Sequence, residues 1–576
     1  VEAAIRANEA GREVIVTGWT NKLAVFLMTY LPDGLITPLI RWGAKNINSK
    51  TSMTITATES QHYDLIIIGS GAGGGTLAYA LANTGKQILI LERGQELPVE
   101  PQNWDSKAVF VDHRYRTSEQ WVDKDNHPFT PNTNYWVGGN TTFYGAALMR
   151  MKKRDFEAVE HSDGLSPAWP LSYTDFAPWY EKAEALWRVH GERGIDPNDQ
   201  PEDPPFPYPP LIDDPGVAKL KQHFQDLGWH PSPLPLGINR DDAHPLTSHC
   251  VRCTTCGGYP CLLKAKSDAR SIVIDPIRNL SNVTILTGHR VKHIEAHDKA
   301  VTGVVTETND GALQTFTGDL YALAAGAANS AAILLQSATA AHPNGLANSS
   351  GLVGRNYMFH TTSAVISIMA DRFDSTFPKI FAVNDFYFGD KDYPYPMGQI
   401  QLLEYMSGQT LEGQISDILP PPLIPDFLSD DIARHMVAFL TMTEDLPREE
   451  NRVNVTDTGQ IRLTYTPNNL PAHLKLTQKL EQALKSFSLR QHTLFEPHFQ
   501  IDSLLPLYGT AHQCGTLRFG RDPSTSVLDV NCKAHDLDNL YVVDTSFFVS
   551  SSSVNPTLTT VANALRVGEH LKERMA

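Results

Sequence analysis

The stretch Gly69-Ser-Gly71-Ala-Gly-Gly74 follows the apolar run Tyr63-Asp-Leu-Ile-Ile-Ile68 and precedes a second apolar run, Lys86-Gln-Ile-Leu-Ile-Leu-Glu92. The two apolar runs predict strands, and the residues from Ala72 to Asn83 predict the helix that connects them. A strand, a glycine turn and a helix in this order, with an acid ending the next strand, are typical of a dinucleotide-binding unit. This unit decides the expected fold class, an α/β protein with a Rossmann-like domain.

Each glycine of this unit, and the acid that ends it, has a physical role in binding a dinucleotide. Gly69 permits the tight turn, Gly71 lets the backbone approach a pyrophosphate, and Gly74 lets helix and strand pack closely. The helix that starts at Ala72 points free N–H groups and its dipole at the phosphates. Glu92 can accept hydrogen bonds from the ribose hydroxyls. The alternative is a glycine turn with a purely structural role.

Composition and charge exclude some classes of protein. The chain has 576 residues, of which 41% are apolar and 19% are charged, so more than one domain and a large core are expected. Its 64 acidic and 48 basic residues give a net charge of −16, which repels the phosphates of nucleic acid. We therefore expect no nucleic-acid partner.

Residues 1–60 differ from the rest of the chain and are predicted to be an N-terminal extension and linker. They resemble the C-terminal tail of short-chain dehydrogenases, which implies that the chain is the back part of a fusion. The apolar stretch Leu23–Leu31 is shorter than the roughly 20 residues of a transmembrane helix. We expect no transmembrane span, and residues 19–42 are a candidate for peripheral membrane contact. We expect a cytoplasmic location, with a periplasmic or membrane-peripheral one as alternatives.

Further motifs follow the glycine turn in a fixed order and carry a more specific resemblance. From about Tyr63 to its C-terminus the chain resembles the glucose–methanol–choline (GMC) oxidoreductases, which hold FAD. The motifs are Gly69–Gly74, Gly138-Gly139-Asn140 with Tyr144-Gly145, Ala324-Ala-Gly326-Ala, Gly351-Leu-Val-Gly354-Arg-Asn356, His512-Gln-Cys-Gly515-Thr516, and Asp544 with Asn555-Pro556.

The positions of the cofactor-type segments predict the domain organisation. They occur at the start, in the middle and at the end of the chain, so one FAD-binding domain is expected from residues 61–155, 262–357 and 505–576. A substrate or cap domain with an antiparallel sheet is expected from residues 156–261 and 358–504, which include the cysteine cluster 250–261. The expected fold is therefore mixed α/β and α+β.

The resemblance also implies where cofactor contacts lie. Val291 gives backbone contacts near the adenine, and Gly139 and Asn140 lie by the flavin ring. Asp544 lies near the ribityl or pyrophosphate portion, and Asn555 to Thr557 lie against the pyrimidine end. The family commonly has Asn where this chain has Tyr144. The predicted cofactor-binding residues are Gly69, Gly71, Ala72, Gly74, Glu92, Arg93, Gly138, Gly139, Asn140, Tyr144, Gly145, Val291, Ala325, Gly326, Asp544, Pro556 and Thr557.

His512 and Asn555 are the predicted catalytic pair. Oxidation of an alcohol by a flavin removes a proton from oxygen and a hydride from carbon, and histidine is suited to take the proton near neutral pH. An amide can steady the oxygen as it becomes an alkoxide, and the family has His or Asn at this second position. The structural alternative for Asn555 is a turn or helix cap before Pro556.

Four of the six cysteines, Cys250, Cys253, Cys256 and Cys261, lie within twelve residues. Their spacing is close to the C-x2-C-x2-C-x3-C run of iron–sulfur ferredoxins, and some membrane-associated GMC dehydrogenases carry a cluster in this region. Zinc is a second interpretation, because C-x2-C is a common half-site. Disulfides or buried free thiols are the third.

The sequence therefore predicts an FAD-dependent oxidoreductase acting on a CH–OH group of an alcohol or sugar, with hydride transfer to flavin N5. Oxygen, a quinone or a redox protein is the expected electron acceptor. Two alternatives stay open: a redox-neutral lyase or decarboxylase on the same scaffold, and a flavin subunit of an electron-transfer complex that uses the cysteines as a relay.

Overall fold

A computed structural model describes residues 62–576 apart from 370, 406, 411–425, 491–498 and 510. The predicted N-terminal extension and the candidate for membrane contact, residues 19–42, lie outside the described residues. No helix in the described part of the chain is long and apolar enough to cross a membrane.

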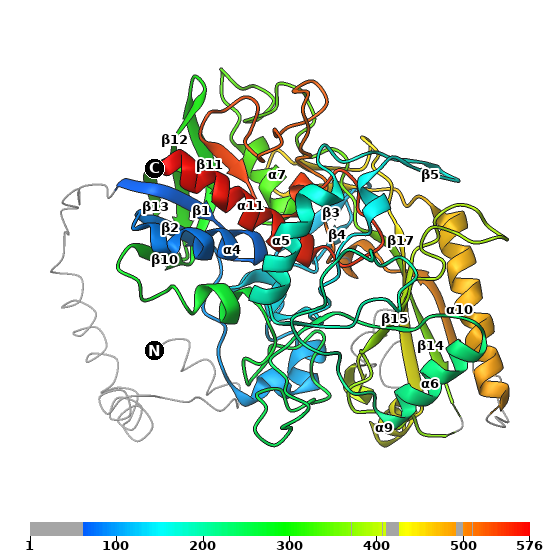
Figure 1. The fold of residues 1–576 in the computed structure, drawn as a ribbon. Helices are drawn as coiled ribbons and strands as arrows, with labels where there is room; N and C mark the ends of the chain where they lie inside the picture. Colours follow the sequence, from blue (N-terminus) through cyan, green and yellow to red (C-terminus); the bar gives the residue numbers. More distant parts are fainter. Residues whose placement is uncertain (1–61, 370, 406, 411–425, 491–498, 510) are drawn as a thin grey trace, which may run out of the picture. The chain divides into compact units, whose positions relative to one another are not determined.

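One seven-stranded sheet brings together strands from three distant parts of the chain (Figure 1). Its order is β10-β2-β1-β13-β12-β11, and β21 pairs with β13. The pairs β10–β2, β2–β1, β1–β13 and β13–β21 are parallel, whereas β11, β12 and the start of β13 are antiparallel. The strands are β1 (His62–Ile68), β2 (Ile88–Glu92), β10 (Val283–Thr287), β11 (His289–His297), β12 (Ala300–Thr308), β13 (Leu313–Leu323) and β21 (Leu540–Val542).

Two helices pack closely on each other beside this sheet. Helix α4 (Ala72–Leu81) follows the glycine turn, and α11 (Thr557–Met575) ends the chain and lies along α4 in Figure 1. A Cβ atom at Gly568 of α11 would lie 3.0 Å from the Cβ of Ala80, so a glycine is needed for this close approach. The first and last α-helices of the described residues therefore pack side by side.

A second, six-stranded antiparallel sheet has the order β20-β14-β17-β16-β15-β8. Helix α10 (Leu470–Arg490) covers one of its faces, because Ser363 and Thr443 of the sheet both contact His473. The helix forms there because its buried residues Leu476, Leu480 and Leu484 recur at every fourth position. The strands are β8 (Ser232–Pro233), β14 (His360–Ile368), β15 (Phe381–Val383), β16 (Gln399–Leu402), β17 (Met436–Glu444) and β20 (Phe499–Leu504).

Smaller elements connect the two sheets. A four-stranded sheet has the order β18-β19-β3-β4, and two two-stranded sheets pair β5 with β6 and β7 with β9. These strands are β3 (Trp121–Asp123), β4 (Pro128–Phe129), β5 (Val159–His161), β6 (Gly164–Ser166), β7 (Val189–His190), β9 (Leu236–Gly237), β18 (Arg452–Val455) and β19 (Ile461–Thr464). The remaining α-helices are α5 (Tyr173–Leu186), α6 (Pro215–Asp226), α7 (Ala327–Gln336) and α9 (Asp426–Arg434).

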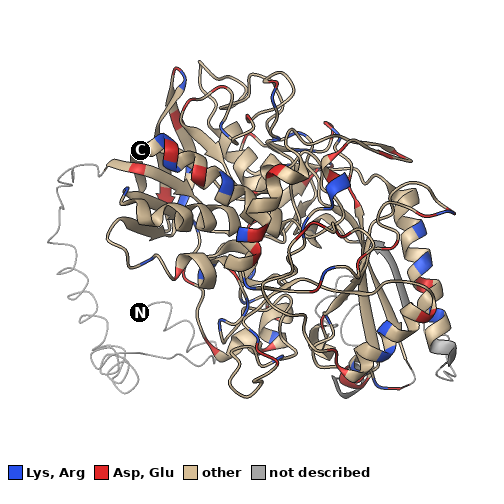
Figure 2. Ribbon diagram, viewed as in Figure 1, with Lys and Arg blue, Asp and Glu red and all other residues tan. Residues whose placement is uncertain are grey.

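The predicted fold class is confirmed: a mixed α/β protein with a parallel sheet and a separate antiparallel sheet. The predicted helix from Ala72 to Asn83 is found as α4, followed by a short 3₁₀ turn, Ala82–Thr84. The boundaries between cofactor and cap domains stay a prediction, since residues 61–576 form one unit. Figure 2 shows basic residues interspersed with acidic ones over the described elements.

Candidate active site

A cavity of about 730 Å³ is lined by residues from both large sheets. The glycine turn after β1, the loop 132–145 and the chain around His512 and Asn555 form its walls, together with strands of the antiparallel sheet. All of the predicted catalytic and cofactor-binding residues line this cavity except Gly74 and Gly138. The structure therefore brings together residues that are spread over nearly five hundred positions of the chain.

Two helices begin at glycines in this cavity. Gly71 precedes α4 and Gly326 precedes α7, and neither helix has a side chain capping its first turn or an acid in it. A Cβ atom at either glycine would meet nothing within 4 Å, so open space lies beside both helix starts. Free N–H groups and a helix dipole that face such space fit the phosphates of a dinucleotide.

Other glycines allow the backbone segments around this space to approach one another. Gly69 has a φ of +103°, and a Cβ atom there would lie 2.4 Å from the carbonyl oxygen of Ala324. A Cβ atom at Gly74 would lie 2.1 Å from the carbonyl oxygen of Gly69, and one at Gly139 would lie 3.3 Å from Cα of Gly71. Gly74 therefore supports the turn from outside the cavity, while the Gly138–Gly139 segment lies against Gly71.

Two buried acids accept hydrogen bonds from the backbone around the starts of α4 and α7. Glu92 at the end of β2 accepts hydrogen bonds from the backbone N–H groups of Ser70, at 3.1 Å, and Gly94, at 2.8 Å. Asp544 after β21 accepts from the N–H groups of Gly326 and Ser546, both at 2.9 Å. Burial raises the pKa of Asp544, although these donors act in the opposite direction.

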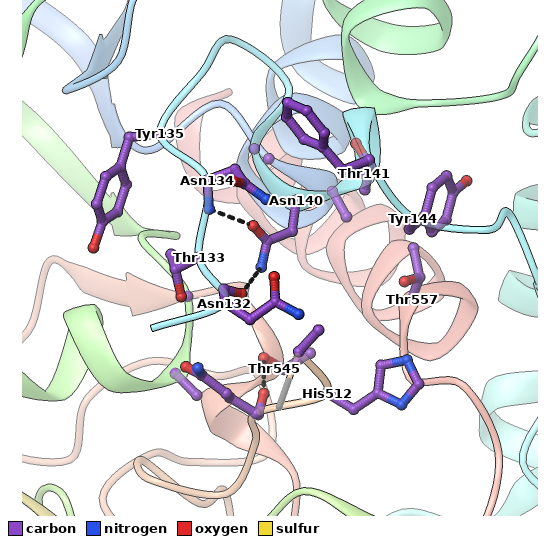
Figure 3. A pocket seen from close by; sticks show the side chains of 18 of the residues that line it. Asn132, Thr133, Asn134, Tyr135, Asn140, Thr141, Tyr144, His512, Thr545 and Thr557 are labelled. Atoms are coloured by element: carbon purple, nitrogen blue, oxygen red, sulfur yellow. Dashed lines mark hydrogen bonds between the residues drawn. The ribbon is translucent and has the colours of Figure 1, made fainter. Parts of the chain in front are cut away.

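Four other predicted cofactor residues, Asn140, Arg93, Tyr144 and Val291, also line the cavity. Asn140 bridges the loop, because Oδ1 accepts from the N–H of Asn134 at 2.7 Å and Nδ2 donates to the carbonyl of Asn132 (Figure 3). Arg93 lies over the ring of Tyr135, 3.6 Å from its centroid. Tyr144 donates its hydroxyl to the carbonyl of Ser267, and Val291 lies in β11.

His512 and Asn555 meet in the cavity. The amide nitrogen of Asn555 lies 3.5 Å from Nε2 of His512. Because an amide nitrogen is a donor, this contact favours the tautomer in which Nε2 carries a lone pair. The amide oxygen of Asn555 is buried and finds no hydrogen-bond partner among the described residues. The pair can therefore accept a proton at one atom and make a further hydrogen bond at the other.

The electrostatic environment keeps His512 neutral. Burial lowers its pKa well below the ordinary value, and the positive charge of Lys379 and the His360 ring act in the same direction. The rings of His360 and His512 are 5.0 Å apart. Burial lowers the pKa of His360 to about 4, and its Nε2–H donates to the carbonyl of Val554 at 3.0 Å. A neutral imidazole is the form that can act as a base.

A buried serine turn, Ser550–Ser553, positions Asn555. Three other segments of the chain form hydrogen bonds with this turn. The position of Asn555 therefore depends on these bonds as well as on α11. The contacts are Trp169 Nε1 to Ser550 Oγ at 2.8 Å, Ser551 Oγ to the Asp445 carbonyl at 3.0 Å, and Ser553 N–H to the Tyr387 hydroxyl at 3.0 Å.

The sequence analysis missed several polar residues of the cavity, among them Lys379, Gln401 and Glu404. Lys379 Nζ lies 3.0 Å from Glu404 Oε2. Burial alone would raise the pKa of Glu404, but the Lys379 ammonium outweighs it and holds that pKa below its ordinary value. The one local signal was the alternation Gln-Ile-Gln-Leu in β16, Gln399–Leu402, which places two glutamines on the same face of the strand.

The cysteine loop lies beside the cavity but does not gather its sulfur atoms. All four thiols are free, and among the described residues the only three candidate ligand atoms within 4.8 Å of one another belong to Asp123, Asp125 and His127, on an exposed turn. Burial raises the pKa of Cys256 to about 12. The iron–sulfur and zinc interpretations of Cys250, Cys253, Cys256 and Cys261 gain no support from this geometry and stay predictions, and no disulfide joins the four residues.

Known proteins resemble the chain over most of its length. Two family models described as GMC oxidoreductase match residues 63–362 and 420–564. The 6'''-hydroxyparomomycin C oxidase of Streptomyces lividus is 29% identical over 542 residues, which are 90% of this chain and 93% of that protein. The 2-methyl-1,2-propanediol dehydrogenase of Mycolicibacterium austroafricanum is 26% identical over 552 residues, covering 90% and 97%. A solved structure of Aspergillus oryzae formate oxidase has the same fold, with a TM-score of 0.65 at 17% identity over 90% of this chain and 99% of that one.

Proposed function

We propose that the chain, which belongs to the GMC oxidoreductase family and has FAD as its cofactor, oxidises a CH–OH group of an alcohol or sugar. The family matches confirm the membership that the motifs predicted. The observation that carries the proposed reaction is the 3.5 Å contact between His512 and Asn555 inside the cavity that the cofactor residues line.

His512 acts as the general base in this proposal. Its pKa is lowered by burial, so Nε2 is unprotonated at neutral pH and can take the hydroxyl proton of the substrate. Lys379 keeps the imidazole neutral until substrate binds, because its positive charge opposes a second one nearby. Proton transfer to Nε2 leaves the substrate oxygen negative as the C–H bond breaks.

Asn555 stabilises that oxygen. Its amide nitrogen is a donor beside the base, so the oxygen that loses its proton to His512 can accept a hydrogen bond from Asn555. The serine turn holds the amide before the substrate arrives, which avoids reorganisation during the reaction.

Bound FAD supplies the acceptor for the hydride that leaves the carbon. The residues that would hold FAD are the uncapped starts of α4 and α7 for the phosphates, Glu92 for the ribose, and the Gly139–Asn140 segment for the ring. The names of two relatives agree with oxidation of a hydroxyl group, since one is an oxidase of a hydroxy compound and the other a diol dehydrogenase.

The test is an anaerobic panel of alcohols and sugars, followed by visible absorbance of the purified holoenzyme. At least one CH–OH compound is expected to bleach the flavin band with the release of one carbonyl product per flavin. Turnover of a compound without any bleaching, and with no net oxidation of the product, would overturn the proposal in favour of the redox-neutral lyase.

A further inference from the structure

One face of the antiparallel sheet forms the wall of the cavity in the cap. Gln401 of β16 pairs across the strands with Leu440 of β17, and Leu440 pairs with Ala364 of β14. All three line the cavity, as do Ile366 and Leu403. Because cross-strand partners point to the same face, Gln401 is a polar side chain set in an otherwise apolar row.

Gln401 is fully buried at 0% exposure, yet neither Nε2 nor Oε1 has a hydrogen-bond partner among the described residues. Gln399, two positions earlier on the same strand, differs, since its Nε2 donates to Oδ1 of Asn384 at 2.9 Å. Buried amides without partners are rare because they lose their bonds to water. An unpaired amide on a cavity wall is therefore expected to pair with a ligand.

An ion pair follows the strand that carries Gln401. Lys379 precedes β15, Glu404 follows β16, and Lys379 Nζ lies 3.0 Å from Glu404 Oε2. Both line the cavity, and the positive charge of Lys379 acts on His512. The polar wall is thus near the base that we assign to the reaction.

Two glycines make room for this ion pair. A Cβ atom at Gly145 would lie 1.9 Å from Lys379 Nζ, and one at Gly257 would lie 1.6 Å from Glu404 Oε1. Neither glycine has a positive φ, so the missing side chains are needed for space rather than for backbone conformation. The loop that carries Tyr144 and the cysteine loop therefore both lie against the charged groups of this ion pair.

We propose that Gln401, Lys379 and Glu404 form a substrate subsite for a neutral, polyhydroxylated compound, a polyol or sugar. This inference rests on the proposed function, because it names the substrate class of the same site. Gln401 offers one donor and one acceptor, Lys379 a donor and Glu404 an acceptor, which matches hydroxyl groups that both donate and accept. The two charges cancel, so neither an anion nor a cation is favoured. An apolar alcohol would leave the amide of Gln401 unpaired.

The test compares Gln401→Met with wild type, using sorbitol and glucose as polyhydroxylated probes and 1-hexanol as an apolar probe with the same number of carbons. Gln225→Met on the exposed face of α6 is the matched control, because Gln225 is absent from the cavity lining. Binding to the holoenzyme is measured by titration calorimetry, and flavin bleaching is measured separately under anaerobic conditions.

In wild type, sorbitol or glucose is expected to bind at least tenfold more tightly than 1-hexanol. Gln401→Met is expected to weaken binding of that probe about tenfold or more, as for a site whose polar group loses its partner, while binding of 1-hexanol is unchanged or tighter. Gln225→Met should leave all three unchanged. Preference of the wild type for 1-hexanol, no binding of either polyhydroxylated probe, or equal effects of Gln401→Met on both classes would each overturn the subsite.

The two measurements separate this inference from the proposed function. Sugar binding that depends on Gln401, but without bleaching by any compound of the panel, supports the subsite and contradicts the oxidation. Bleaching by 1-hexanol with no sugar binding supports the oxidation and contradicts the subsite. A Lys379→Met/Glu404→Gln double variant, which removes both charges together, is expected to weaken sugar binding as well, and unchanged sugar binding in it would contradict their role.

Discussion

The amide nitrogen of Asn555 lies 3.5 Å from Nε2 of His512, although 43 positions separate the two residues in the chain. His512 lies in an irregular segment after β20, whereas Asn555 follows the buried serine turn Ser550–Ser553, just before α11. Their contact places a proton acceptor and a hydrogen-bond donor side by side at one cavity. The predictions below test this pair, the cofactor contacts around it and the packing that holds the cysteine loop.

Replacing His512 by Ala removes the proposed base. The rate of substrate-driven flavin reduction is expected to fall by a factor of roughly 10²–10⁴, as for a lost general base. Stopped-flow absorbance under anaerobic conditions measures this rate. His535→Ala is the control, because His535 contacts Ser526 and does not line the cavity. Reduction of the His512→Ala enzyme at the wild-type rate would remove His512 from the mechanism.

Replacing Asn555 by Ala removes the donor to the developing alkoxide. The maximal rate of flavin reduction is expected to fall by about 10²–10³, with a smaller change in the half-saturating substrate concentration, because this bond strengthens in the transition state. Asn555→His keeps a donor at this position and should retain more of the rate than Asn555→Ala. Equal losses in the two variants would indicate that Asn555 serves only the packing of the turn.

The pH dependence follows from the lowered pKa of His512. Burial, the His360 ring and Lys379 all lower it, so the base form is present through neutral pH and protonation occurs only well below the ordinary value of about 6.5. Flavin reduction is therefore expected to be constant from about pH 6.5 upwards and to fall on the acid side.

A double variant tests whether Lys379 contributes to the lowered pKa of His512. The Lys379→Met/Glu404→Gln double variant removes the positive charge beside His512 without leaving Glu404 as an unpaired buried carboxylate. Its acid limb is expected to move to higher pH, because protonated His512 no longer meets that charge. An acid limb at the wild-type position would show that Lys379 does not act on the base.

Replacing Glu92 by Ala is expected to weaken retention of FAD. Glu92 is buried, ends β2 and already orders the turn through Ser70 and Gly94, so its loss removes both the proposed ribose acceptor and the hydrogen bonds that hold the turn. The measurement is the ratio of flavin to protein absorbance after gel filtration. Glu92→Gln should retain more FAD than Glu92→Ala, and the exposed Glu181→Ala should match wild type. Full FAD occupancy in Glu92→Ala would contradict the assignment.

Lys266 ties the cysteine loop to the rest of the protein. Its buried ammonium donates to the carbonyls of Tyr259 at 2.7 Å, Tyr144 at 2.9 Å and Cys256 at 3.2 Å. Lys266→Met keeps the length of the side chain but loses these bonds, so the free energy of unfolding is expected to fall by about 2–4 kcal/mol. Denaturant titration measures this change, with Lys219→Met on the exposed face of α6 as the control. An unchanged free energy of unfolding would show that the three hydrogen bonds of Lys266 do not stabilise the fold.

Local patterns could be read from the sequence because they depend on few neighbours. The βαβ unit was predicted closely, since Gly69 has a positive φ and Gly74 lies against the Gly69 carbonyl, so both requirements arise within the unit itself. The start of α11 at Thr557 is likewise local, because it directly follows Pro556. Tyr387 shows the limit of such patterns, since it is buried and its hydroxyl bonds the Asp155 carboxylate and the N–H of Ser553, which are far from it in the chain.

From the sequence alone we could predict the cofactor unit, the order of the motifs and the candidate pair His512 and Asn555. The tertiary structure was needed to show that Gln401, Lys379 and Glu404 line the same cavity as this pair, and that no three of the clustered cysteine sulfur atoms lie within 4.8 Å of one another. The physical reason is range: a glycine turn is fixed by the backbone of a few adjacent residues. The surroundings of a buried glutamine depend on strand register, which is set by pairing between segments far apart in the chain.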